Sequence, residues 1–139
     1  MLAFTGQVVA LWPDRPLLMT AWASIPVYCA GLGLWGWSAR TAGSRRLSLA
    51  FSDDAPKALI TGGPYRIVRH PFYAAYLLYW LAGWIATGNW FVAGTSVLAA
   101  ALCVDAACRE ERKFMASPLS SAYEDYRADT GMFFPSLRK

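Results

Sequence analysis

The feature that most constrains the fold is residues 72–104, a run without a single charged side chain. One helix needs about 20 apolar residues to cross a bilayer, so this run is too long for one crossing. Near its middle stands Thr87-Gly88-Asn89, a sequence that favours a reversal of the chain. The run therefore predicts a helical hairpin, with spans at residues 71–87 and 90–108.

A second uncharged stretch, residues 17–37, is also long enough to cross a bilayer. Pro26 should kink this helix, and Gly31, Gly33 and Gly36 would leave one face flat enough for close helix packing. Residues 1–12 are apolar but too short to span, and the sequence does not tell whether they enter the membrane. Hydrophobic residues make up 56% of the chain and charged residues 16%, which is unlike a soluble domain.

Together these features predict one domain, residues 1–139, that is an all-α integral membrane protein with about three transmembrane helices. Six of the 13 lysines and arginines fall in residues 38–70 and six in residues 109–139. Positive charge collects on the cytoplasmic side of membrane proteins, so this loop and the C-terminal tail are both predicted to be cytoplasmic. The basic residues do not form a nucleic-acid footprint.

The three cysteines, Cys29, Cys103 and Cys108, lie in apolar runs without the spacing of metal ligands. They predict small buried side chains rather than a disulfide framework or a zinc site. No metal is expected.

The hairpin would bring two charged sequence motifs to one end of the bundle, Arg69-His70 before the first span and Glu110-Glu111 after the second. His70 is the one histidine of the chain. Ionisable groups beside a membrane are costly to keep, which favours a functional site over surface decoration. A purely interfacial His70 before the helix-starting Pro71 is the plainer alternative.

These two motifs belong to a longer sequence pattern: Gly63-Pro64-Tyr65-Arg66-Ile67-Val68-Arg69-His70-Pro71-Phe72-Tyr73, a hairpin, Glu110-Glu111, then Tyr123-Glu124-Asp125-Tyr126 and Pro135. The pattern resembles the isoprenylcysteine carboxyl methyltransferase and phospholipid methyltransferase superfamily. This resemblance implies a site for S-adenosyl-L-methionine inside a helical bundle. The residues implied to line it are Lys57, Ala58, Leu59, Ile60, Tyr65, His70, Pro71, Phe72 and Tyr73, with Glu110 or Glu111 meeting the amino group of the cofactor.

The chemistry of the cofactor suits these residue types. Arg69 or His70 can bind its carboxylate and a glutamate its ammonium, each through a charge-assisted hydrogen bond. Aromatic rings can attract the sulfonium by a cation-π contact. The sequence identifies no catalytic residue.

Several side chains have plainer interpretations beside the functional ones. Asp105 stands four residues before Arg109, which predicts an ion pair on one helix, or else a wall of the substrate entrance. Neighbouring glutamates point about 100° apart on a helix, so we expect only one to face the site and the other to pair with a base such as Arg112 or Lys113. Tyr123 and Tyr126 predict a packing face.

The methyl acceptor stays open. The prenylcysteine enzymes carry an arginine one turn before the glutamate, where this chain has Ala106 or Ala107, so a carboxylate acceptor lacks its partner. The expected partners are the lipid bilayer and a lipophilic small-molecule or lipidated acceptor, methylated on oxygen, nitrogen or sulfur. The alternatives are a small non-enzymatic membrane subunit and a sterol-reductase-like enzyme.

Overall fold

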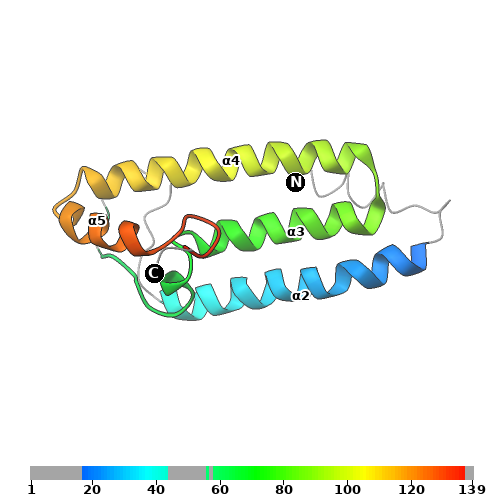
Figure 1. Cartoon of the computed structure of the whole chain (residues 1–139), viewed down its shortest axis with the longest axis horizontal. Coiled ribbons are helices and arrows are strands. Elements are labelled where there is room, and N and C mark those ends of the chain that lie inside the picture. Colours follow the sequence, from blue (N-terminus) through cyan, green and yellow to red (C-terminus); the bar gives the residue numbers. More distant parts are fainter. Residues whose placement is uncertain (1–16, 44–55, 57, 137–139) are drawn as a thin grey trace.

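The computed structural model describes residues 17–43, 56 and 58–136; residues 1–12 and Lys57, on which predictions were made, lie outside this part. The helices are α2 (Leu17–Ala42), α3 (Pro71–Thr87), α4 (Trp90–Met115) and α5 (Ser120–Asp129), with a 3₁₀ turn, η1 (Gly63–Arg66). The described residues form no strand, so the prediction of an all-helical fold is confirmed. Figure 1 shows α3 lying between α2 and α4, with α5 at one end of the bundle.

The turn between α3 and α4 forms where the sequence predicted a reversal. Gly88 ends α3 in the left-handed conformation, with φ of +57°, and its N–H donates to the carbonyl of Trp84 at 2.8 Å. A residue without Cβ adopts this conformation at little cost. Asn89 then caps α4, its side chain accepting the N–H of Phe91 at 2.8 Å. Glycine and asparagine thus end one helix and start the next.

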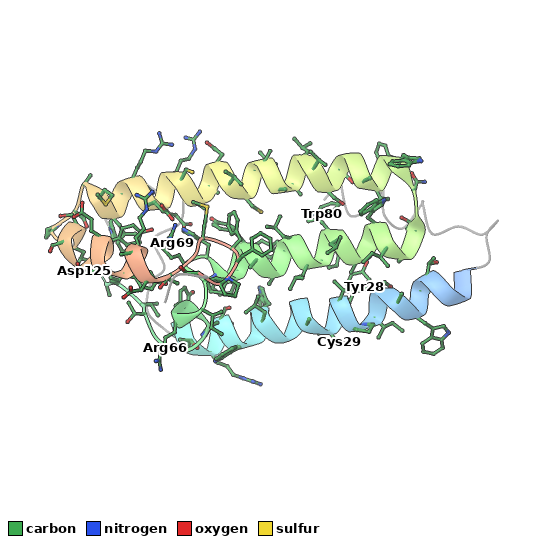
Figure 2. The ribbon with its side chains drawn as sticks, in the orientation of Figure 1. Tyr28, Cys29, Arg66, Arg69, Trp80 and Asp125 are labelled. Carbon is green, nitrogen blue, oxygen red and sulfur yellow. The ribbon has the colours of Figure 1, made fainter. Side chains whose placement is uncertain are left out.

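Helices α2 and α3 run antiparallel and in close contact. The Tyr28 and Tyr79 rings meet edge to face at 5.3 Å. Figure 2 shows Tyr28 on the side of α2 that faces α3. A Cβ on Gly31 would lie 3.3 Å from the carbonyl oxygen of Ala75, whereas a Cβ on Gly33 or Gly36 would meet no atom of the described residues within 4 Å. The predicted flat glycine face is therefore right for Gly31 and wrong for the other two, which do not face α3. The helix is continuous through Pro26.

Of the described helices one, α4, combines the length and apolar composition needed to cross a membrane. Helix α3 has 17 residues. Only 17% of the most apolar 18-residue window of α4 is buried, and large side chains such as Val97 (70% exposed) face outward. A core helix of a soluble protein would be mostly buried, so this exposure favours contact with lipid. Cys29 is exposed and Cys103 and Cys108 are only partly buried, which corrects the expectation that the three cysteines are buried. The described helices do not cover the side of α2 that carries Cys29.

Helix α4 continues to Met115, seven residues past the predicted end of the apolar span at 108. The residues after 108 include arginine, glutamate and lysine, which are good helix formers, so loss of hydrophobicity does not end the helix. Helix α5 then folds back on it, with the Tyr123 ring stacked on Phe114 at 4.9 Å. Tyr123 is 2% exposed, so the predicted packing role of this tyrosine is confirmed.

Candidate functional site

The imidazole of His70 lies between two carboxylates at one end of the hairpin. Its Nδ1 is 3.3 Å from Oε2 of Glu110, and its Nε2 is 3.3 Å from Oε1 of Glu111. His70 and Glu111 are buried, and the Glu110 side chain is 17% exposed. We call Arg69, His70, Glu110 and Glu111 the His70 cluster.

The hairpin explains why residues some 40 positions apart meet. His70 immediately precedes α3, whose first residue is Pro71, and the turn at Gly88 sends α4 back along α3. Each residue of a helix advances about 1.5 Å, so positions at similar distances from the turn lie side by side. Proline at the first helical position is favourable because its missing N–H has no helical partner there.

Arg69 approaches Glu111 from the other side. Its Nε donates to Oε1 of Glu111 at 2.9 Å, and this arginine side chain is only 9% exposed. Its Nη1 donates to the backbone carbonyls of Arg127, at 3.3 Å, and Thr130. Figure 2 shows Arg69 at the end of the bundle where α4 and α5 meet. Arg127, whose side chain is half exposed, adds a longer ion pair of 3.7 Å to Oε2 of Glu111.

Aromatic side chains surround the cluster. The Tyr73 hydroxyl donates to Oε1 of Glu110 at 2.7 Å, and the Tyr73 ring stacks on the His70 ring at 5.8 Å. The centroid of the Phe133 ring lies 6.1 Å from that of the His70 ring. Tyr65 is 7% exposed, and its hydroxyl has no hydrogen-bond partner among the described residues.

The contacts set the protonation of the cluster. Burial alone lowers the pKa of His70, but hydrogen bonds to Glu110 and Glu111 and their charges outweigh it and raise the pKa above its ordinary value. Burial likewise acts to raise the pKa of Glu111, yet hydrogen bonds from His70 and Arg69 lower it to about 2. The favoured state is an imidazolium donating to two carboxylates.

Two expectations about this site need correction. Both glutamates face His70, although one was expected to point away; the two nitrogens of the ring bridge side chains that leave α4 in different directions. His70 contacts both glutamates directly, because buried charges are stable only when paired. Arg112, a predicted partner of one glutamate, donates to the carbonyl of Cys108 at 3.2 Å.

The other predicted site residues are more dispersed. Ala58, Leu59 and Ile60 lie in an irregular segment before η1, and Ala58 is exposed. Pro71 is fully buried, and Phe72 packs edge to face against Trp35 of α2 at 6.3 Å. Their assignment to a cofactor stays a prediction. Asp105 forms the predicted ion pair with Arg109, at 2.7 Å and about half exposed.

Sequence reasoning missed the contribution of the chain after α5. Arg69 and His70 donate their backbone N–H groups to the carbonyls of Gly131, at 2.8 Å, and Met132, at 3.1 Å. Backbone carbonyls carry no sequence signature, so no motif could have indicated these partners. The aromatic run Phe133-Phe134, two residues after Gly131, was the available signal.

The chain is thus a helical protein with an outward-facing apolar helix and a compact charged site at the helix ends. Residues 19–121 match the phospholipid methyltransferase family, and the chain belongs to that family of membrane-bound methyltransferases. The match includes the whole His70 cluster and ends within α5.

One curated relative is the cobalt-zinc-cadmium resistance protein CzcN of Cupriavidus metallidurans, 36% identical over 106 residues. The aligned region covers 76% of this chain and 49% of the relative, so the chain spans about half the length of that protein. No solved structure matches the chain. Within the described ranges no group of three or more histidine, cysteine, aspartate or glutamate side chains could hold a metal ion.

Proposed function

We propose that this protein transfers a methyl group from S-adenosyl-L-methionine to a membrane-soluble or amphipathic acceptor, in the manner of the isoprenylcysteine carboxyl methyltransferases. The observation that carries the proposal is the buried His70 between Glu110 and Glu111, in a chain of a methyltransferase family. A second, partly accessible carboxylate provides capacity to bind a cation.

The two glutamates differ in how many hydrogen-bond acceptor sites remain unused. Glu111 is buried and accepts from Arg69 and His70, with Arg127 nearby, so its lone pairs are largely used. Glu110 is the more exposed of the two and keeps acceptor capacity beyond Tyr73 and His70. We therefore assign the ammonium of the cofactor to Glu110 and an orienting role to Glu111.

The residues present fit the remaining groups of the cofactor. The Tyr65 hydroxyl is a buried donor without a hydrogen-bond partner in the described part of the chain, a costly state that a ligand would relieve. Burial, with a smaller contribution from the charge of Glu110, raises the pKa of Tyr65 to about 12, so the phenol stays a neutral donor.

When bound, S-adenosyl-L-methionine supplies an electrophilic methyl group on a sulfonium. The chain itself would orient the amino-acid end through Glu110 and surround the methyl with the Tyr73 and Phe133 rings. Positive charge disappears from the sulfonium during transfer, so apolar surroundings disfavour the charged ground state. The acceptor atom, whether oxygen, nitrogen or sulfur, is not specified by these residues.

The membrane arrangement belongs to the same proposal. Helices α2 and α3 would cross the bilayer beside α4, with the His70 cluster at the cytoplasmic end, as the distribution of basic residues indicates. Exposed tryptophans on both α2 and α4, Trp22 at 69% and Trp90 at 82%, suit contact with lipid or its interface. An acceptor dissolved in the bilayer would then enter sideways, with Asp105 near its path.

Calorimetry with S-adenosylhomocysteine on the purified protein in lipid nanodiscs tests the proposal. Wild type should bind, and Glu110→Gln should weaken binding at least tenfold, about 1.4 kcal/mol. Glu124→Gln is the matched control, because Glu124 is an exposed carboxylate on α5. A folded wild type that binds no S-adenosylhomocysteine would remove the proposal, and binding of a reduced nicotinamide cofactor instead would favour the reductase alternative.

A further inference from the structure

We propose that the C-terminal segment, residues 130–134, forms a wall of the cofactor site through Phe133, and that Arg69 is the positioning residue that holds this wall in place. The inference rests on the proposed function and deepens it. It concerns residues that follow the part of the chain matched to the family, which ends at residue 121. The match to the family therefore does not itself assign a role to this segment.

Backbone pairing fixes the segment against the residues that carry the imidazole. Val68 and Gly131 form a parallel bridge. The N–H of Arg69 donates to the Gly131 carbonyl at 2.8 Å, and the N–H of His70 donates to the Met132 carbonyl at 3.1 Å. Two successive hydrogen bonds define a register, so the side chain that follows Met132 has a set position relative to His70.

The Arg69 side chain fastens the same segment at its start. Its Nη1 donates to the carbonyls of Arg127 and Thr130, which belong to the end of α5 and would otherwise lack helical partners. A cation at a helix C-terminus is also favoured by the helix dipole. Because Nε of the same guanidinium binds Glu111, one side chain joins α4, α5 and the loop before α3. Such a three-way contact needs the fork of donors that arginine alone provides.

A second contact that fixes α5 lies about one helical turn before Thr130. The Tyr126 hydroxyl donates to the Tyr65 carbonyl at 2.6 Å, tying α5 to η1. The backbone is also tightly folded after α5, because a Cβ on Gly131 would collide with the carbonyl oxygen of Phe134. The C-terminal segment is therefore held at several points, and it is not a tail that merely follows the last helix.

The segment carries two phenylalanines in different surroundings, so a contact with the cofactor can be tested separately from the folding of the segment. The Phe133 ring lies 6.1 Å from the His70 ring at an angle of 58°, and its side chain is half-buried. Phe134 is 78% exposed. The Phe133 ring lies beside the His70 ring, where it would meet a bound cofactor. Phe134 has the same chemistry but is largely exposed, so it serves as the matched control.

The first experiment compares Phe133→Ala with Phe134→Ala. Phe133→Ala should weaken S-adenosylhomocysteine binding about threefold to tenfold, the range of one aromatic contact, and shift the proton signals of the His70 ring by removing a ring current. Phe134→Ala should leave both unchanged. Equal affinity in Phe133→Ala and wild type would overturn the wall, and a wild type that binds no S-adenosylhomocysteine would instead overturn the proposed function.

A double-mutant cycle tests the role of Arg69. Arg69→Lys keeps the positive charge near Glu111 but loses the fork, so it should weaken binding and abolish the same ring-current shift. If Arg69 acts through the segment, adding Phe133→Ala to Arg69→Lys should cost little more, because the wall is already displaced. Fold losses that multiply would show that Arg69 acts independently of the wall and would overturn the positioning role.

A third variant distinguishes displacement of the segment from a folding defect in Arg69→Lys. Gly131→Ala disturbs the segment while leaving the whole His70 cluster intact. It should reproduce the loss of affinity and the shift of the His70 signals, with helix content by circular dichroism equal to wild type. A helical Gly131→Ala protein with wild-type affinity and wild-type His70 signals would contradict the proposal.

Discussion

Removing the charge of Glu111 should destabilise the folded protein strongly, even though the change to glutamine conserves shape. Glu111 is 6% exposed and accepts hydrogen bonds from Arg69 at 2.9 Å and His70 at 3.3 Å. Glu111→Gln leaves a buried guanidinium and a buried imidazolium with one fewer anion. Of the two cations, the remaining carboxylate, Glu110, forms its described ion pair with His70 and not with Arg69.

The loss of unfolding free energy caused by Glu111→Gln can be estimated in two ways. Folding lowers the pKa of Glu111 from 4.5 to about 2, and each unit corresponds to 1.36 kcal/mol, which gives about 3 kcal/mol of stability from the ionised form. Removing one partner of a buried ion pair usually costs about 3 to 5 kcal/mol. Both estimates give a loss of at least about 3 kcal/mol. For a chain of this length that is roughly a 10 °C fall in Tm.

Thermal unfolding in one detergent, followed by circular dichroism, measures the effect. The matched control is Glu124→Gln, an exposed carboxylate on α5, which should change the unfolding free energy by less than about 0.5 kcal/mol. A loss below about 1 kcal/mol for Glu111→Gln, with the control unchanged, would refute the view that Glu111 balances two buried cations.

Three further predictions concern packing, the surface ion pair and pH. Gly33→Ala should stabilise α2 by up to about 1 kcal/mol, whereas Gly31→Ala should gain less because its Cβ would lie 3.3 Å from Leu78; equal Tm shifts would contradict the assigned contact face. Asp105→Asn removes an ion pair that is about half exposed, so stability should fall by no more than about 1 kcal/mol; a larger fall in Tm would contradict this. The pKa of His70 is raised on folding, so its stabilisation is complete below pH 6.5 and is lost as pH rises through the folded value. The Tm difference between wild type and His70→Gln should therefore shrink from pH 6 to pH 9, and a constant difference would refute it.

The hairpin could be predicted because its signals are local. An uncharged run too long for one span, interrupted by Gly88-Asn89, leaves few alternatives, and the structure ends and starts its helices at these residues. The meeting of His70 with the two glutamates follows from the hairpin. That both glutamates reach the ring could not be predicted, because it depends on the position of the imidazole between α3 and α4.

The contacts of Arg69 were beyond sequence reasoning for a different reason. Its partners at the end of α5 are backbone carbonyls, which every residue has. Only the folded path of the chain brings Thr130 and Gly131 beside Arg69, 61 and 62 residues away along the sequence. The sequence singled out Arg69 as a residue that could bind the cofactor, whereas the structure shows what the guanidinium joins.

The lone histidine allows a direct test of the central claim, that the methyl donor binds at the His70 cluster. With ¹⁵N-histidine labelling the chain has one imidazole to observe, since His70 is its only histidine. Titration with S-adenosylhomocysteine should shift the His70 ring signals in wild type, saturating at one ligand per chain, and Glu110→Gln should need at least tenfold more ligand. Ring signals that stay in place while calorimetry reports binding would locate the cofactor elsewhere and contradict this account.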